Sequence, residues 1–464
     1  MNDGDPALSA VAACTADPAG AVLLRGGTVL TLDAAATVIR GDVLIADGRI
    51  AAIGPALAAL PGARVLDAAD SFILPGLIQG HVHLGQTFFR GLAEGRRLLA
   101  WLRERIWPLE AAHDDESAYW CTMLGAAECL LGGTTTVQDI GLGPGVRGLL
   151  DALVDSRLRA LAGQCLMDSG EGLPAGLAGD TDAVLAATVA LGERYDGAGH
   201  GRLRYLLNPR FILTCSDALW QGIRELALGR GWAVHTHALE QQEETAAVRA
   251  TRQGRDEIEY FADTGLLATQ LRLAHGVWIS EAHLPRLDPR RVSVVHCPSS
   301  NLKLGSGVAD VVALRRAGLA VGIGADGAPC NNRLDAFAEL RLAALLQMLR
   351  HGPGALSGLD ALRLATSEGA RALGLEALVG TVEVGKAADL LVLSRCQPEL
   401  TAAAAVDPHD LIAFGASRTA VRHVLVAGEP LVEEGRLTHL DLGEICRRAG
   451  QALAQLLVRS GLSL

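Results

Sequence analysis

The sequence predicts an α/β protein: a (β/α)₈ barrel of the TIM type, with a small β-sandwich domain formed from both chain ends. Three observations lead to this expectation. The 464 residues are 50% apolar but only 4% aromatic, which favours a core of Ala, Leu and Val over a sandwich of aromatic-rich strands. Eight short apolar strands alternate with helical patterns between residues 73 and 374. Histidines and one aspartate recur where these strands end.

The two ends of the chain share a β-rich texture. Residues 1–20 are small, polar and acidic, lack the positive segment of a signal peptide, and are expected to form a disordered tail. Short strands follow over 21–72, with a hairpin turn at Asp47-Gly48, and similar strands return over 375–440. We expect these two segments to pair into one sandwich domain. Residues 441–464 have helical spacing and predict a C-terminal helix.

The middle of the chain, residues 73–374, has the size and the alternation of a barrel. A doubly wound sheet is the competing layout, and it would concentrate its chemistry at one switch point rather than around a ring. The eight predicted strands are Ile73–Ile78, Thr134–Gln138, Ala160–Met167, Leu203–Pro209, Trp232–His237, Leu271–Ala274, Val292–Val295 and Ala320–Gly324.

Composition excludes several classes of function. The net charge is −11, which argues against a nucleic-acid partner because phosphate binding needs a basic face. No apolar run approaches the ~18 residues of a membrane-spanning helix. The nine cysteines are scattered without a CxxC pair, which indicates reduced thiols and a cytoplasmic location rather than a zinc knuckle or a redox motif.

Residues with metal-binding chemistry follow five of the predicted strands. His81 and His83 are two residues apart, so both imidazoles point to the same face of the first strand. In a barrel all strand ends on one side meet at one mouth, where three imidazoles and a carboxylate would suit zinc or iron(II). The residues at the other four ends are His235 and His237 after the fifth strand, His275 after the sixth, His296 after the seventh and Asp326 after the eighth.

Glu240 lies three residues beyond His237, outside the predicted strand. We interpret it as an acid/base group rather than a ligand, because a hydrolase needs a proton shuttle beside the metal. For Glu243 and Glu244 we favour a solvated acidic helix start. Histidines that stand alone elsewhere are interpreted as core or surface residues; these are His113, His200, His351, His409 and His439.

Several sequence runs resemble the amidohydrolase superfamily. They are ILPGLIQGHVH, HTHALE, LAHG, HCPSSN and GADGAPCNN, followed by GTVEVGKAADLLVL at the return into the small domain. The resemblance spans about residues 22–432. The runs HLGQTFFRGLAEG, WLRERIWPLE and GGTTTVQD are similar to deaminases of 5′-deoxyadenosine, methylthioadenosine and adenosylhomocysteine within that superfamily.

The resemblance implies four ligands for one divalent metal ion, zinc in the first place and iron(II) as the alternative: His81, His83, His237 and Asp326. It also implies that His275 orients the attacking water, that Asp326 takes the proton of that water, and that Glu240 protonates a ring nitrogen. The fourth strand contains no Lys, so a carboxylated-lysine site with two metals is not implied. His235 does not match a ligand position, and either supports the site from behind or packs within its strand.

The resemblance also suggests residues that face the substrate. Gln86, Arg210 and Phe211 match positions that hold the base in guanine deaminases, whereas Glu110 matches the carboxylate that binds ribose hydroxyls in methylthioadenosine deaminases. The latter enzymes usually have a histidine at the position of Arg210. His296 has no ligand role in the family, and we place it on the substrate side.

Together these features predict a metal-dependent hydrolytic deaminase that releases ammonia from a purine nucleoside or base, in the first place a 5′-deoxyadenosine-type analogue. The alternatives are a guanine-type base deaminase, an s-triazine aminohydrolase or chlorohydrolase, and a catalytically silent scaffold. The filled ligand and acid/base positions argue against the scaffold. We expect a small heterocyclic substrate, a homodimer or larger homo-oligomer, and neither nucleic acid nor membrane as a partner.

Overall fold

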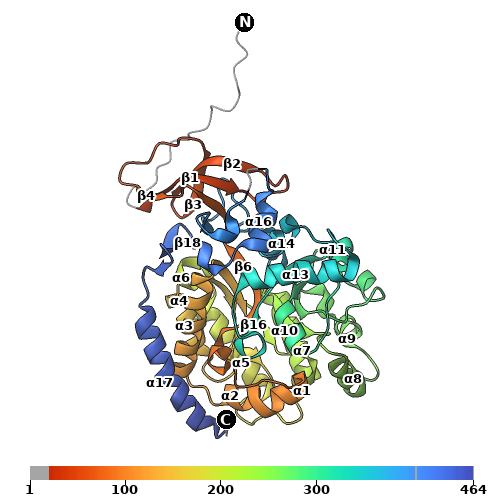
Figure 1. Ribbon diagram of the computed structural model, residues 1–464. Coiled ribbons are helices and arrows are strands. Elements are labelled where there is room, and N and C mark those ends of the chain that lie inside the picture. Colours follow the sequence, from red (N-terminus) through yellow and green to blue (C-terminus); the bar gives the residue numbers. More distant parts are fainter. Residues whose placement is uncertain (1–19, 403–404, 463–464) are drawn as a thin grey trace.

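The computed structural model describes residues 20–402 and 405–462 (Figure 1), so the predicted N-terminal tail lies almost entirely outside the described residues. The described chain is a mixed α/β structure with one nine-stranded mixed sheet and three parallel sheets of five, four and two strands. Figure 1 places the strands of the mixed sheet at one end of the molecule and the parallel strands, with helices around them, below it. No helix among these residues is long and apolar enough to cross a membrane.

The nine-stranded sheet draws its strands from both ends of the chain, as predicted. Asp47 and Gly48 form the expected turn between two of its strands, and both have the positive φ that a tight hairpin turn needs, 50° and 72°. The strands are β1 (Val22–Leu30), β2 (Val38–Ala46), β3 (Arg49–Gly54), β4 (Arg64–Asp67), β5 (Ser71–Pro75), β17 (Leu390–Ser394), β18 (Val421–Val426), β19 (Glu429–Glu433) and β20 (Arg436–Leu437).

The parallel sheets contain seven of the eight predicted strand regions of the middle segment and the last part of the first one. The five-stranded sheet has the order β10-β8-β7-β6-β16, and the four-stranded sheet has the order β12-β13-β14-β15. A parallel bridge between Leu207 and Val234 links the two sheets. The strands are β6 (Leu77–His83), β7 (Thr134–Asp139), β8 (Arg159–Ala162), β9 (Cys165–Leu166), β10 (Leu203–Tyr205), β11 (Asn208–Pro209), β12 (Val234–Ala238), β13 (Leu271–His275), β14 (Val292–His296), β15 (Ala320–Ile323) and β16 (Asp326–Gly327).

The first predicted strand, Ile73–Ile78, is wrong as a single element. Its first part is β5, which pairs with β1 and β17 in the mixed sheet, and its second part begins β6 in the parallel sheet. The chain changes sheets at Gly76, where a Cβ atom would lie only 2.1 Å from Cγ2 of Thr135. A residue without a side chain is therefore needed at this crossing. The third and fourth predicted strands are also each divided in two, into β8 and β9 and into β10 and β11.

Helices connect the parallel strands. The predicted C-terminal helix is α17 (Leu442–Ser460), which lies along the outer side of α3 (Figure 1). The others are α1 (Leu98–Trp101), α2 (Trp107–Ala111), α3 (Asp115–Leu131), α4 (Val146–Asp155), α5 (Thr181–Tyr195), α6 (Ala198–Gly201), α7 (Asp217–Arg230), α8 (Gln242–Thr251), α9 (Glu257–Asp263), α10 (Pro298–Lys303), α11 (Val311–Arg316), α12 (Ala328–Asn331), α13 (Ala336–His351), α14 (Gly358–Leu364), α15 (Ser367–Ala372) and α16 (Pro408–Gly415), with a 3₁₀ turn at Leu84–Phe89 and a π-helical turn at Leu102–Ile106.

Strand β17 shows how the mixed sheet is attached to the rest. Its residues alternate between two apolar clusters, as expected where both faces of a strand are buried. Leu390 and Val392 pack into a cluster within the mixed sheet, whereas Leu391 and Leu393 join the large core that contains residues of the parallel strands and their helices. The mixed sheet therefore anchors the β5–β6 junction, which in turn holds the start of the strand that carries His81 and His83.

Candidate active site

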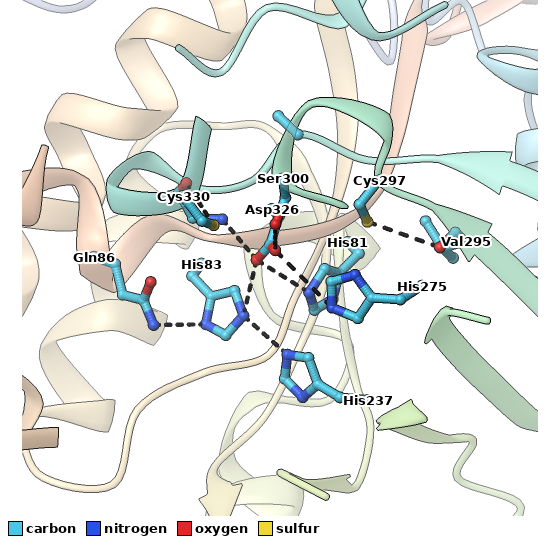
Figure 2. Close-up of polar contacts among 12 residues, drawn as sticks. His81, His83, Gln86, His237, His275, Val295, Cys297, Ser300, Asp326 and Cys330 are labelled. Carbon is cyan, nitrogen blue, oxygen red and sulfur yellow. Dashed lines mark hydrogen bonds and ion pairs between the residues drawn. The ribbon is translucent and has the colours of Figure 1, made fainter. Parts of the chain in front are cut away.

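The predicted ligands come together at the carboxyl ends of the parallel strands. His81 and His83 project from the end of β6, His237 from β12, and Asp326 begins β16 beside β6. Figure 2 shows His83, His237, His81 and Asp326 pointing toward one another, with His275 of β13 next to them. His81, His83, His275 and Asp326 are buried, whereas His237 is partly exposed.

The distances among these side chains suit one metal ion. Nε2 of His83 lies 3.2 Å from Nε2 of His237, and both His81 Nε2 and His83 Nε2 lie 3.3 Å from Oδ1 of Asp326. Candidate ligand atoms of His81, His83 and His237 all lie within 4.8 Å of one another. His81 Nε2 is buried without a hydrogen-bond partner among the described residues. A buried nitrogen lone pair aimed at two other imidazoles and a carboxylate fits a divalent ion such as zinc.

The electrostatics favour ligand-competent protonation states. Burial lowers the pKa of His83 and of His237 well below the usual range of an imidazole, which keeps both rings neutral and able to bind a metal. For Asp326, burial alone would raise the pKa of the carboxyl. The neighbouring His81, His83 and His275 outweigh burial and hold that pKa well below its ordinary value.

The acid/base candidates lie on the β12–β13 side of this cluster. His275 Nε2 is 3.4 Å from Oε2 of Glu240 and 3.9 Å from Oδ2 of Asp326, so the imidazole lies between the two carboxylates. Burial raises the pKa of Glu240 above its ordinary value, which favours the protonated form that a general acid needs. Ser306 Oγ donates to Oε1 of Glu240 at 3.2 Å and helps to orient the carboxyl.

Three residues of the site occupy the left-handed region of backbone space without being glycines. They are Leu239 with φ 53°, His275 with φ 71° and Asp326 with φ 62°. Such a conformation costs on the order of 1–3 kcal/mol per residue and persists only where the surroundings enforce it. Backbone strain is therefore present at three of the strand ends that deliver side chains to this centre.

Two side chains that the sequence analysis did not single out hold His275 and Asp326 in place. Nδ1 of His275 lies 2.9 Å from Oδ1 of Asn301, so the ring donates through Nδ1 and leaves Nε2 as an acceptor facing Glu240. Ser300 Oγ donates to Oδ2 of Asp326 at 2.6 Å (Figure 2). Both residues belong to the run HCPSSN after β14, so their place in a strand-end motif was the available signal.

A cavity opens above the cluster. Apolar side chains form one wall, namely Leu98, Trp101, Leu102, Phe211 and Leu304. Polar and charged side chains form the other, namely His83, His237, His275, Glu240, Glu244, Arg210 and Asp326. An apolar wall facing a few convergent polar groups is typical of a site for a small heterocycle. The contribution of Leu98, Trp101, Leu102 and Leu304 was not predicted, because nothing in their local pattern distinguishes a pocket wall from core.

The five predicted substrate-facing residues take different positions. Arg210 and Phe211 line the cavity. Gln86 and Glu110 lie in a buried network behind it: Gln86 Nε2 donates to Oε1 of Glu110 at 2.7 Å, and Arg210 donates to Oε2 of Glu110 at 2.6 Å. His296 is fully buried and is absent from the cavity lining formed by the described residues.

Two further features of this region add to the sequence analysis. The expectation of a solvated position is wrong for Glu244, because its Oε2 accepts from the backbone N–H groups of Glu240 and Gln241 at the buried start of α8. Glu243, in contrast, is exposed as expected. Burial lowers the pKa of His296 to about 3, so this ring is neutral.

The family is defined by the comparison with known sequences. Residues 72–431 match the model of the amidohydrolase family. This match covers more than half of the chain and includes every strand that carries a candidate ligand. The chain belongs to the amidohydrolase family.

Several proteins similar to this chain are deaminases. The chain is 35% identical to a 5-methylthioadenosine/S-adenosylhomocysteine deaminase of Moorella thermoacetica, over 92% of this chain and 97% of the relative. It is 33% identical to a 5′-deoxyadenosine deaminase of Methanobrevibacter smithii, over 90% and 94%. A solved adenosine deaminase from Xanthomonas campestris with bound zinc matches with a TM-score of 0.87 at 31% identity, over 94% of this chain and 98% of that one.

Proposed function

We propose that this protein is a zinc-dependent hydrolytic deaminase of a purine nucleoside, in the first place a 5′-deoxyadenosine-type adenosine analogue, and that it releases ammonia. One observation carries the proposal: three neutral imidazoles and a carboxylate meet at one cavity beside Glu240, whose pKa is raised. Curated relatives that match at least 90% of this chain are named for such deaminations.

His81, His83, His237 and Asp326 would hold one divalent ion, with zinc as the first candidate and iron(II) as the alternative. Zinc is favoured because it is bound in the adenosine deaminase neighbour. Bound there, the ion would acidify water so that hydroxide is available near neutral pH. The strand Leu203–Tyr205 and its continuation to Pro209 contain no Lys for a second metal, so we propose a single ion.

The chain's own residues then account for the proton transfers. Asp326 and His275 receive the proton of the attacking water, while its oxygen forms a bond to the ring carbon that bears the amino group. Glu240 gives its proton to the adjacent ring nitrogen. When the C–N bond breaks, the proton held by Asp326 or His275 passes to the departing amino group, which leaves as ammonia because an amide ion is too poor a leaving group. The second proton of the attacking water leaves the oxygen for Glu240 as the carbon–oxygen double bond forms, which restores the protonated Glu240. The short distances from His275 to Glu240 and Asp326 support this relay.

The cavity supports a flat substrate. Phe211 and the apolar wall of Leu98, Trp101 and Leu102 would cover the faces of a purine and its apolar 5′ group. Arg210 would donate to a ring nitrogen or to a sugar oxygen, with Gln86 and Glu110 behind it. His296 is buried outside this lining at the end of β14, so we propose that it acts on the substrate only indirectly, by supporting that strand end.

We extend the proposal to the architecture. Since β16 pairs with β6 and the Leu207–Val234 bridge joins the two larger parallel sheets, we propose that the segment 73–374 closes into a (β/α)₈ barrel from Gly76 onward, its first residues being part of β5. The mixed sheet would fold as a β-sandwich of 21–72 and 375–440 around its own apolar cluster, with Leu442–Ser460 as the C-terminal helix. A homodimer or larger homo-oligomer in the cytoplasm completes the proposal; the eight cysteines among the described residues are free thiols, as expected there.

The test is a substrate panel followed by ultraviolet difference spectra and ammonia detection. It compares 5′-deoxyadenosine, methylthioadenosine, adenosine, adenosylhomocysteine, guanine, 8-oxoguanine and an aminated s-triazine with zinc-loaded protein. Turnover of the adenosine analogues, with 5′-deoxyadenosine or methylthioadenosine ahead, is the expected result. If guanine or the triazine is turned over and none of the adenosine analogues is, the proposed substrate is wrong, but the assignment as a hydrolase stands.

A further inference from the structure

His235 lies directly behind one of the proposed metal ligands. It stands two residues before His237 on β12, is fully buried, and is therefore one layer deeper below the cavity. Nε2 of His235 lies 2.8 Å from Nδ1 of His81, and Nδ1 of His235 lies 3.2 Å from the backbone oxygen of Arg272. Both nitrogens of this buried ring are thus engaged.

The order of these contacts determines where the hydrogens are. A backbone carbonyl can only accept, so His235 Nδ1 carries a hydrogen and donates to Arg272. In a neutral imidazole the other nitrogen is then an acceptor, and His235 Nε2 must accept from Nδ1–H of His81. His81 is left with its lone pair on Nε2, the atom that lies 3.3 Å from Asp326 Oδ1 and faces the candidate metal position.

The backbone oxygen of Arg272, which accepts the hydrogen bond from His235, is itself held firmly. His235 and Arg272 are partners in the register of β12 and β13. The Arg272 side chain is buried and donates to Oε1 of Gln138 and to the backbone oxygen of Leu373, both at 2.6 Å. The carbonyl that orients His235 therefore belongs to β13, a strand that pairs with β12 and β14 and is also held by the side-chain hydrogen bonds of Arg272.

We infer that His235 is a positioning residue that fixes the tautomer and the orientation of His81 and thereby sets the affinity of the site for its metal. This inference rests on the proposed ligand role of His81. Partners of this kind, which hold the distal nitrogen of a ligating histidine, typically change metal affinity by about 10–100-fold when they are removed.

The test compares two substitutions at the same position. His235→Phe fills the space but removes the acceptor, so Nδ1–H of His81 is buried without a partner or the ring changes tautomer and loses its Nε2 lone pair. His235→Gln keeps one oxygen that can accept from His81 and one N–H₂ group that can donate to Arg272. Zinc dissociation constants are measured by competition with a chromophoric chelator, and the unfolding temperature of each protein is recorded with and without zinc.

We expect His235→Phe to weaken zinc binding by about 10–100-fold and His235→Gln to stay within about threefold of the unaltered protein. His423→Phe is the matched control, because His423 is also buried on a strand but lies in the mixed sheet; it should leave zinc affinity unchanged. Zinc affinity that is the same in His235→Phe as in the unaltered protein, or equally weak in both variants, would overturn the inference.

The outcome is separable from that of the proposed function. If the unaltered protein binds no zinc at this site, the ligand assignment itself fails, and if it binds zinc but turns over no purine, only the substrate assignment fails. Should His235→Phe not fold, His235→Leu takes its place. If neither folds, His235→Gln decides by itself, since a loss of more than about tenfold in zinc affinity would contradict the positioning role.

Discussion

The two sides of the cavity are built in different ways. On the metal side, the side chains come from strand ends, and a backbone carbonyl or a buried side chain holds the distal nitrogen of each of His81, His237 and His275. On the apolar side, Leu98, Trp101 and Leu102 come from short helical turns over residues 98–106, and Phe211 and Leu304 complete the apolar lining. The proposed chemistry thus rests on a framework of strands, whereas most of the proposed apolar contact surface for the substrate rests on the segment between β6 and β7.

Ion pairs show the same contrast. The buried pair between Arg210 and Glu110 joins the two sides at the floor of the cavity, with both side chains at most 3% exposed. At the rim, Arg97 pairs with Glu243 and Lys303 pairs with Glu94, all of them partly exposed. Exposed pairs contribute little, typically about 0–1 kcal/mol, whereas breaking a buried pair leaves an uncompensated charge. We therefore expect substitutions on the two kinds of pair to differ strongly.

Removal of the metal should have the largest effect, because it acts on the strand side as a whole. Prolonged dialysis against a chelator should abolish measurable deaminase activity, and added zinc should restore it. Activity and metal content are measured on the same samples. Full activity in protein shown to be free of metal would contradict the role of the histidine cluster.

Glu240→Gln should have the next largest effect. The amide cannot give a proton to the ring nitrogen, so kcat should fall by about 10²–10⁴-fold while zinc content stays the same. Steady-state kinetics on the best substrate of the panel, with metal analysis, provide the measurement. Glu243→Gln is the control on the neighbouring exposed carboxylate; equal turnover in the two variants would remove Glu240 from the mechanism.

Glu110→Gln tests the buried ion pair between Arg210 and Glu110. It leaves the guanidinium of Arg210 buried without its counter-charge, so the free energy of unfolding should fall by about 3–5 kcal/mol and KM should rise. Denaturant unfolding and steady-state kinetics measure the two effects. Glu243→Gln, which breaks only the rim pair with Arg97, should cost at most about 1 kcal/mol. Similar losses in both variants would mean that burial does not distinguish these pairs.

The smallest expected effect concerns Glu339, a buried carboxyl that supports the segments after β14 and β16. Burial raises the pKa of Glu339 to about 7, and this carboxyl accepts from Ser299 N and Asn331 Nδ2 in the short helices α10 and α12, which follow β14 and β16. A raised pKa means that the folded protein holds the proton more tightly. The stability that this group contributes is therefore full below its ordinary pKa and is lost as the pH rises through about 7.

Glu339→Gln, which cannot ionise, should remove this dependence. Between pH 5 and pH 8 the stability of the variant relative to the unaltered protein should rise by roughly 1–3 kcal/mol. Unfolding temperatures at several pH values provide the measurement. A difference that is independent of pH would show that Glu339 does not titrate in this range.

Much of the strand side could be predicted from the sequence. Alternation along a strand places His81 and His83 on one face, and parallel strands deliver their carboxyl ends to the same side of a sheet. Local pattern alone was therefore sufficient to group His237, His275 and Asp326 with them. The division of the first predicted strand at Gly76 was missed because the residues on both sides of it favour a strand. Only the close approach of Thr135, which is distant in sequence, requires a glycine there.

The sequence by itself predicted the α/β class of fold, the family and the histidines and Asp326 that the structure brings together, because these depend on periodicity and on motifs at strand ends. Tertiary structure alone decided how these residues are supported. Arg210 meets Glu110 across 100 residues, and His235 meets His81 across 154. Contacts between such distant residues depend on how segments pack in space, and no local pattern encodes that packing.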